Sequence, residues 1–478
     1  MEEEAMRGTN VISLEEIRET KRQAQLRQRL QQRFEQWFEK VEAEVNGSTA
    51  TLAQLTGVVF NLRQELASAV VEGLIEQQDQ AEFVRQESVC PECAQRLRSR
   101  RNVERTVETM VGTVTVSRPY FYCVRCQHGF YPLDQVLGLT KERKQGDVQH
   151  AVVQLTKEVP YETACEVFTE LTGLSVSTHL AHDVTNTVAE GLTVLDVSPT
   201  REEVEEKLTA VAEGKKRRPI LVCAIDGAAV PTRPEGARRK RRGRKRVRAK
   251  RACWQGEWRE AKGFRLYLVD EERIVHLISW HQIQDEDGLF AALKQVKEAG
   301  LLPEDRVRLC VLADGARWIW NRIHGVFPTA QEILDYYHCS QYIHRVAQAQ
   351  YPDQPHKALE WVEATMARLF CNEVQSVIWG LQRMKPRNEE ADAEIKTTLG
   401  YLEHHKNRVT YGALRKGGYP LGSGGIESAN KFICHVRLKR SGSWWYVANG
   451  NHMLALRCAK YNGTFDRIFE RYHLKNTP

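Results

Sequence analysis

The sequence predicts a multidomain α+β protein, in which a small cysteine-bound β unit and several helices precede an α/β domain with an all-α insertion. Three observations support this fold class. Two Cys-x-x-Cys pairs bracket an alternating segment, two short aliphatic runs each end in Asp-Gly, and residues 340–412 have a mostly helical pattern. With 478 residues and 42% hydrophobic side chains, the chain is long enough for about two to four domains with packed cores.

The aliphatic runs predict buried strands that end in carboxylates. Residues 220–227 form an apolar run with Asp226 at its carboxyl end, and residues 307–315 repeat the pattern with Asp314 at the tip. A third acid, Glu427, lies in a glycine-rich turn before a predicted helix. An Asp-Gly pair after a strand is most often only a turn. A less specific set of three acids could therefore be drawn with Asp270 or Asp287 in place of Asp226 or Asp314.

Three acids that converge in space are costly unless cations neutralise them. Hard divalent ions prefer oxygen ligands, and two Mg²⁺ ions roughly 4 Å apart can clamp the attacking and leaving oxygens of a phosphodiester. The pattern therefore predicts a site for metal-dependent chemistry on phosphodiesters at Asp226, Asp314 and Glu427.

The segments between the first two acids predict the topology of this domain. Further strands are expected at 263–269 and 273–280, and a helix at 287–299. The order strand, strand, strand, helix, strand is that of an RNase H-like domain. We place this core at 219–338, with a helical insertion at 339–415 and a final helical part at 416–478.

The N-terminal 80 residues predict a helical hairpin. A Ser13-x-x-Glu16 capping box opens a long helix to about residue 45, and a second helix follows from about Thr51. The apolar stripes of both helices suit packing within their own domain, and a dimerisation arm is the alternative.

Residues 81–140 predict a zinc ribbon. Cys90 and Cys93 are separated by 29 residues from Cys123 and Cys126, and the intervening segment alternates like paired strands around Gly112. Four thiolates suit tetrahedral Zn²⁺ and leave no open position, so this metal is expected to be structural. A pair of disulfides is the alternative, which a reducing compartment disfavours.

Residues 145–195 predict three short helices with Gly173 in a tight connection, which is compatible with a helix-turn-helix DNA-binding region. Its second helix would present five polar side chains to a groove: Thr178, His179, His182, Asp183 and Asn186. A plain helical bundle is the alternative. Residues 196–218 are expected to form a charged linker helix.

The charge is unevenly distributed. The net charge is +7, but residues 238–251 carry eleven Lys or Arg, so the remainder of the chain carries about −4. Such a block binds a polyanion or forms a solvated loop. No segment has the length of a membrane span, the first residues are acidic, and a cytosolic protein is expected.

Taken together, these motifs resemble bacterial insertion-sequence transposases of the ISKra type, within the RNase H-like DDE transposases that carry a helical insertion. The resemblance covers the chain from the ribbon to about residue 460. It depends on the paired Cys-x-x-Cys motifs, Ala-Ile-Asp-Gly at 224–227, Leu-Ala-Asp-Gly at 312–315, Leu-Asp-Tyr-Tyr-His at 334–338, Gly-Ser-Gly-Gly-Ile-Glu at 422–427 and Arg-Leu-Lys-Arg-Ser-Gly at 437–442.

The resemblance implies a transposase that binds terminal repeats and catalyses DNA cleavage and strand transfer. Asp226, Asp314 and Glu427 would bind Mg²⁺ or Mn²⁺, and His338, in an Asp-x-x-His element with Asp335, would lie near the active site with either a catalytic or a structural role. The cations expected to hold DNA phosphates are Arg241, Arg242, Arg244, Lys245, Arg246, Arg437, Lys439 and Arg440.

The expected partners are double-stranded DNA, as transposon ends and target, and further copies of the chain in a dimer or larger assembly. The expected location is the bacterial cytoplasm, in association with the nucleoid. Two alternatives remain open: a catalytically inactive, transposase-derived DNA-binding protein, and an RNase H-like nuclease without strand transfer.

Overall fold

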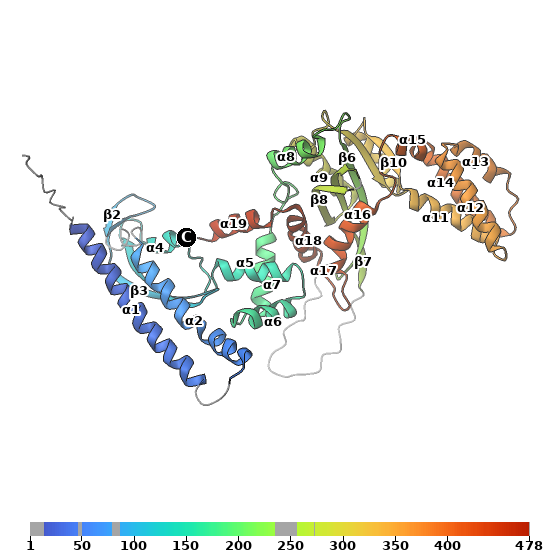
Figure 1. Cartoon of the computed structure of the whole chain (residues 1–478). Coiled ribbons are helices and arrows are strands. Elements are labelled where there is room, and N and C mark those ends of the chain that lie inside the picture. Colours follow the sequence, from blue (N-terminus) through green and yellow to red (C-terminus); the bar gives the residue numbers. More distant parts are fainter. Residues whose placement is uncertain (1–13, 46–49, 79–86, 235–255, 272, 478) are drawn as a thin grey trace, which may run out of the picture. The chain divides into compact units, whose positions relative to one another are not determined.

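The protein is described by a computed structural model that covers residues 14–45, 50–78, 87–234, 256–271 and 273–477 (Figure 1). The chain divides into two compact units, Met1–Val184 with Phe469–Pro478 and Thr185–Ile468. The basic block at 238–251, including Arg241, Arg242, Arg244, Lys245 and Arg246, lies outside the described residues. The domain boundaries expected from the sequence stay predictions.

The first unit begins with the predicted helical hairpin, α1 (Leu14–Val45) and α2 (Leu52–Gln77). Thr51 forms a capping box with Gln54 at the start of α2, whereas Ser13 of the other predicted capping box lies outside the described residues. The Trp37 indole donates to the Leu62 carbonyl at 2.9 Å and so joins the two helices. The two helices therefore pack against each other in the described residues.

Helix α2 packs on the β-sheet of the same unit. Its Val71 and Ile75 cover a buried cluster that includes Val107 and Val114, and Glu72 accepts a hydrogen bond of 2.7 Å from the backbone of Thr115. These contacts agree with packing inside its own unit. The β elements are β1 (Glu87–Val89), β2 (Arg96–Arg98), β3 (Arg101–Thr109), β4 (Gly112–Cys123) and β5 (His128–Phe130).

Strands β3, β4 and β5 form an antiparallel sheet in that order, and β1 pairs with β2. The short helix α4 (Pro132–Val136) places Asp134 under this sheet, where the carboxylate pairs with Arg118 at 2.5 Å. Both residues are buried, so the ion pair replaces water that each charge would otherwise require.

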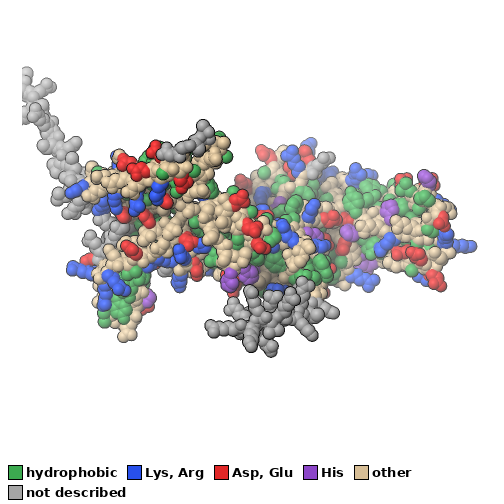
Figure 2. All heavy atoms as spheres, turned by 90° about the horizontal axis from the view of Figure 1, so that it is seen from below, with side chains coloured by type: hydrophobic (Ala, Val, Ile, Leu, Met, Phe, Trp, Pro, Cys, Tyr) green, Lys and Arg blue, Asp and Glu red, His purple; other side chains and the backbone are tan. Residues whose placement is uncertain are grey.

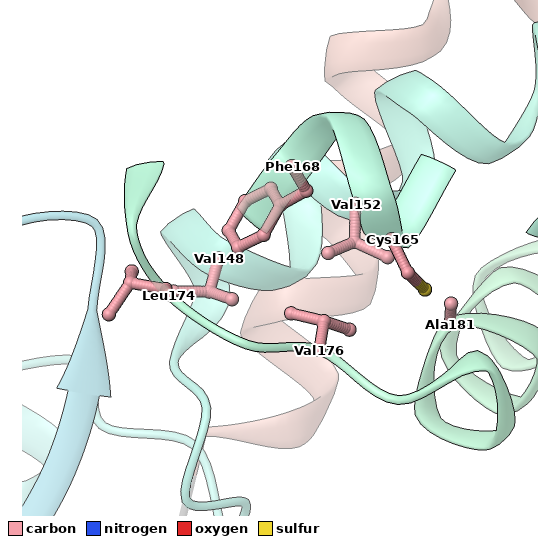
Figure 3. Close-up of a cluster of buried hydrophobic side chains, with 7 residues drawn as sticks. All are labelled: Val148, Val152, Cys165, Phe168, Leu174, Val176 and Ala181. Atoms are coloured by element: carbon pink, nitrogen blue, oxygen red, sulfur yellow. The ribbon is translucent and has the colours of Figure 1, made fainter. Parts of the chain in front are cut away.

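The three helices predicted after the ribbon are present as α5 (Gly146–Thr156), α6 (Tyr161–Thr172) and α7 (Thr178–Ala189). Figure 3 shows the buried side chains that join them, with Val148 and Val152 from α5 against Cys165 and Phe168 from α6. Gly173 ends α6 with φ of 74°, a left-handed conformation that glycine adopts without steric cost.

The second unit is built on a five-stranded sheet with the order β10-β9-β6-β7-β8. Its strands are β6 (Ile220–Thr232), β7 (Glu257–Asp270), β8 (Arg273–Ile283), β9 (Arg308–Ala313) and β10 (Gln331–Leu334). Strands β6, β7 and β8 are antiparallel neighbours, whereas β9 is parallel to both β6 and β10. The predicted strand order with an intervening helix, α9 (Glu286–Glu298), is present, and α10 (Arg317–Val326) adds a helix that was not predicted.

The segment expected to be a linker is part of this unit. Helix α8 (Arg201–Ala212) begins with a capping box of Thr200 and Glu203 and buries Val204, Leu208 and Val211. Lys207 donates to the backbone carbonyl of His276 on β8 at 3.2 Å. The three buried apolar residues recur at helical spacing, which gives α8 a face that must be covered.

After β10 the chain forms helices through the rest of the second unit, and the last of them continues into residues of the first unit. The insertion contains α11 (Tyr336–Gln350), α12 (Pro355–Phe370), α13 (Val374–Arg383), α14 (Glu389–His405), a 3₁₀ turn η1 (Lys406–Arg408) and α15 (Tyr411–Lys416). The chain then continues as α16 (Gly424–Ala429), the π-helical η2 (Asn430–His435), α17 (Val436–Leu438), α18 (Val447–Asn462) and α19 (Phe465–Asn476).

The charges are mixed on one face of the described residues. On the face shown in Figure 2, Lys and Arg side chains are interspersed with Asp and Glu and do not gather in one patch. Within the described part of the chain, no helix combines the length and the apolar character needed to cross a bilayer.

Candidate active site and metal centre

Asp226 and Asp314 occupy neighbouring strands of the main sheet. The parallel register pairs Ile225 with Ala313, the residues that directly precede the two acids. Strand β9 ends at Ala313, but β6 does not end at Asp226, contrary to the sequence prediction. It continues to Thr232 because β7 pairs with it along its whole length. Asp226 therefore lies inside a strand, beside the point where the parallel neighbour ends.

The environment of Asp226 disfavours its negative charge. The pKa of this carboxyl is raised to about 6, mainly by burial and to a smaller extent by the charges of Asp314 and Glu427. The backbone N–H of Gly227, which donates to Asp226 Oδ1 at 2.7 Å, and the nearby His338 lower the pKa and offset part of the shift. A bound cation would favour the ionised form.

Glu427 reaches this neighbourhood from the glycine-rich turn. Its Oε1 accepts a hydrogen bond of 2.6 Å from the hydroxyl of Ser423, one turn earlier in the chain. Gly425 allows the turn to lie against β7, because a Cβ there would be 2.8 Å from Tyr267 Cε1. Arg265 fixes the same point by donating to the Gly425 carbonyl at 2.7 Å. The glycine-rich sequence thus permits the close approach that carries Glu427 to the sheet.

Asp335 and His338 form a pair at the start of α11. Asp335 is fully buried and caps the helix, accepting from the His338 backbone at 2.6 Å and from His338 Nδ1 at 3.0 Å. Burial alone would raise the pKa of Asp335, but these bonds and those from Ser423 lower it. The Asp335 hydrogen bond raises the pKa of His338, as do the nearby Asp314 and Asp226. The histidine therefore lies among carboxylates that favour its protonated form.

Sequence reasoning missed two residues of this neighbourhood. The amide of Asn430 donates from Nδ2 to Asp226 Oδ2 at 2.7 Å, and its Oδ1 lies 3.0 Å from His281 Nε2. The sequence held one indication of the role of Asn430: it lies three residues after Glu427, a spacing that places both side chains on one side of a helix. His281 gives no comparable signal, because its role depends on strand register.

The four cysteines form a second, separate cluster. The sulfurs of Cys90, Cys93, Cys123 and Cys126 all lie within 4.8 Å of one another. Ala94 and Gln127, each directly after the second cysteine of its pair, have φ of 56° and 53°, so both Cys-x-x-Cys turns close in the same way. Backbone N–H groups of the second turn lower the pKa of Cys123 to about 7. This cluster can hold a structural metal such as Zn²⁺.

The three acids are less tightly grouped than the cysteines. Among the described residues, the cysteine set alone brings three or more candidate ligand atoms within 4.8 Å of one another. The charges of Asp314 and Glu427 nonetheless make a small contribution to the raised pKa of Asp226, whose main cause is burial.

The predicted DNA-binding cations of the second unit differ in exposure. Lys439 and Arg440 are exposed, but Arg437 is only 2% exposed and its guanidinium lies 5.0 Å from the centre of the Trp445 ring. Its side chain is therefore not available for a phosphate in this conformation. On the predicted recognition helix, His179 pairs with Asp183 at 2.8 Å, and Asn186 lies 3.0 Å from His452 of α18. Thr178 is exposed and His182 lies 3.1 Å from Asp183.

Comparison with known families gives one match over most of the chain. A model described as an uncharacterised protein family (UPF0236) matches residues 47–473. The chain belongs to the UPF0236 family. No curated protein matches this UPF0236 chain. Among solved structures it is similar to a chain of the "Drosophila P element transposase strand transfer complex", with 10% sequence identity and a TM-score of 0.24 over 68% of this chain and 80% of that chain.

Proposed function

We propose that this UPF0236 protein is a DNA transposase that cuts DNA at the ends of an insertion sequence and joins the freed 3′ ends to target DNA. Asp226, Asp314 and Glu427 are the proposed ligands of two divalent cations, Mg²⁺ or Mn²⁺. The proposal includes structural Zn²⁺ at the four cysteines, double-stranded DNA as substrate, and a homo-oligomer, since two ends must be joined together.

One observation carries this proposal. Asp226 is half-buried and lies close enough to Asp314, Glu427 and His338 for their charges to shift its pKa, although the four residues come from distant parts of the chain. Such a group of carboxylates is unfavourable by itself, and its oxygen donors are those that Mg²⁺ and Mn²⁺ prefer. The strand order, with three antiparallel strands followed by two parallel ones, agrees with an RNase H-like core.

The residues of the site have separable tasks in the proposed reaction. When bound, the cations would neutralise phosphate charge and lower the pKa of a bound water. Asp226, Asp314 and Glu427 provide the oxygen ligands, and Ser423 orients Glu427 through their 2.6 Å hydrogen bond. His338, held by Asp335, brings a positive charge that can offset the charge developing on the phosphate.

A cleavage assay tests the proposal. Purified protein would be incubated with Mg²⁺ or Mn²⁺ and labelled DNA that carries both ends of the element with their flanks. Wild type is compared with Asp226→Asn and Glu427→Gln, with Asp305→Asn as the control, because Asp305 is an exposed acid of the same unit. Cleavage and joining are expected for wild type and Asp305→Asn only, with DNA affinity retained in every variant.

Other outcomes separate the alternatives. Cleavage by Asp226→Asn would show that the acids have been assigned wrongly. Metal-dependent cleavage without joined products would indicate an RNase H-like nuclease, and specific DNA binding without cleavage in wild type would indicate a DNA-binding descendant of a transposase.

A further inference from the structure

We propose that Asn430, itself held by His281, is a positioning residue that fixes the Asp226 carboxylate for cation binding. The inference rests on the proposed function, because it assigns Asp226 to a metal. It adds two residues that neither the sequence motifs nor the family comparison assigns a role.

The hydrogen-bonding capacities of the three side chains define a single chain of donors and acceptors. An ionised carboxylate only accepts, so the NH₂ group of Asn430 must face Asp226 Oδ2, at 2.7 Å. The Asn430 Oδ1 atom then faces His281 Nε2 at 3.0 Å, and this nitrogen must carry the ring proton. Asn430 is 5% exposed and His281 fully buried. Burial also lowers the pKa of His281 to about 4, which keeps the ring neutral.

The sheet creates the space for this chain of hydrogen bonds. Asp226 pairs with Gly263 on β7, and Gly263 pairs with His281 on β8, so the three residues lie in one row across adjacent strands. A Cβ on Gly263 would be 2.1 Å from His281 Cδ2, which shows that the imidazole lies over the glycine. Asn430, the first residue of the π-helical η2, bridges the remaining gap. Single π-helical turns are frequent at functional sites.

The choice of an amide has a chemical consequence. Asp226 accepts from Gly227 N at Oδ1 and from Asn430 at Oδ2, so its orientation is fixed on both oxygens. A lysine or arginine at residue 430 would also orient the carboxylate, but its charge would compete with a cation. A neutral amide orients Asp226 and leaves its negative charge for the metal, and groups that orient metal ligands typically contribute about ten- to a hundredfold to metal affinity.

The test compares variants that keep or remove the donor at residue 281. In Asn430→Ala the donor to Asp226 is lost. In His281→Met the side-chain size is approximately kept but the donor is lost, whereas in His281→Gln an amide N–H is available near the position of Nε2. Asn451→Ala is the matched control. Asn451 lies on α18 and accepts from the backbone of Ile283, on the same strand as His281, at 2.7 Å, and among the described residues it has no hydrogen bond to an acid.

Two readouts are measured, Mn²⁺ affinity by calorimetry and the Mn²⁺ concentration that gives half-maximal DNA cleavage. Asn430→Ala and His281→Met are expected to weaken both by about tenfold or more. His281→Gln and Asn451→Ala should remain within about threefold of wild type, although Asn451→Ala lowers the melting temperature.

The inference fails if Asn430→Ala binds Mn²⁺ like wild type, or if His281→Gln and His281→Met lose the same affinity. If either of these results is found and the wild type still cleaves DNA, the proposed function is unaffected. If the wild type does not cleave DNA, the proposed function is overturned and the Mn²⁺ affinity alone tests the positioning role. Weaker Mn²⁺ binding by Asn430→Ala would then support that role. No Mn²⁺ binding by the wild type would overturn it.

Discussion

The backbone N–H of Ser423 donates to the buried carboxylate of Asp335, so two residues that are 88 positions apart in the chain meet beside the acids. A second bond reinforces this junction, since Tyr336 N donates to the Leu421 carbonyl at 2.8 Å. The helical insertion thus leaves and rejoins the core at one point. Asp335 also binds His338, and Ser423 also binds Glu427, so the junction orients one residue on each side of the insertion.

Asp335→Asn should destabilise the second unit in a pH-dependent way. Asp335 has a lowered pKa and His338 a raised one, so their pair stabilises the fold above the ordinary pKa of aspartate and below the raised pKa of His338. We expect a loss of about 2 kcal/mol near pH 6, typical of buried groups left without partners. Urea unfolding at several pH values would measure it. The difference from wild type should shrink above the raised His338 pKa, and a difference that is constant from pH 6 to pH 9 would contradict the assignment.

The buried histidine of β8 should cause acid destabilisation. Burial lowers the pKa of His281 from 6.5 to about 4, so between these values the unfolded chain binds the proton and the folded protein does not. Stability is therefore lost as the pH falls through this window, by roughly 3 kcal/mol at 1.4 kcal/mol per pKa unit. Denaturant unfolding at pH 7.5 and 4.5 would test this, with His281→Gln losing less stability than wild type. The raised pKa of Asp226 has the opposite effect, because it stabilises the folded protein as the pH falls. The same measurement on Asp226→Asn is therefore needed to separate the two contributions.

Removing one cysteine of the ribbon should affect the first unit alone. Cys123 lies at the end of β4, and its loss would leave three ligands for a tetrahedral ion. Structural zinc contributes about 10–16 kcal/mol of binding free energy in small domains, so Cys123→Ser should lose bound zinc and unfold the ribbon. Elemental analysis should give zinc in wild type and little in the variant. In hydrogen-exchange measurements, the amides of residues 87–140 should lose their protection, whereas those of β6 and β9 should keep it. Cys371→Ser is the control, because Cys371 is an exposed cysteine.

The basic residues near the end of the second unit should separate into two classes. Lys439→Ala and Arg440→Ala should weaken DNA binding and reduce its salt dependence, because each exposed cation can release counterions from a phosphate. Arg437→Ala should mainly lower stability, since its side chain is buried against Trp445. Affinity measured at several salt concentrations, together with melting temperatures, distinguishes these effects. A large fall in DNA affinity for a stably folded Arg437→Ala would show that Arg437 is released on binding.

The sequence was sufficient to predict those parts of the site that depend on local patterns. Aliphatic runs predicted the strands beside Asp226 and Asp314, and Cys-x-x-Cys spacing predicted the cluster of four cysteines. Local patterns did not predict features that depend on strand pairing or on packing between distant residues. The glycine after Asp226 suggested the end of a strand, but β7 pairs with β6 as far as Thr232. Likewise, Arg437 was grouped with Lys439 and Arg440 as a phosphate-binding cation, but its side chain is buried and packs against Trp445.

The contribution of Asn430 and His281 could not be predicted from either residue alone. The two are 149 positions apart, and they meet because Gly263 leaves a gap between two side chains of one row. A single glycine in a strand does not indicate, from the sequence alone, which side chains will occupy the space beside it.

The continuation of β6 beyond Asp226 places the end of this strand at a fixed distance from the acid. Thr232 lies six positions after Asp226 in the strand, and at about 3.3 Å per residue this step spans roughly 20 Å. The densely cationic segment begins shortly after this point in the sequence. In the proposed complex with DNA, whose base pairs rise about 3.4 Å each, the same length would correspond to about six base pairs. Phosphates held at its far end would then lie about half a helical turn away from the bond that is cut.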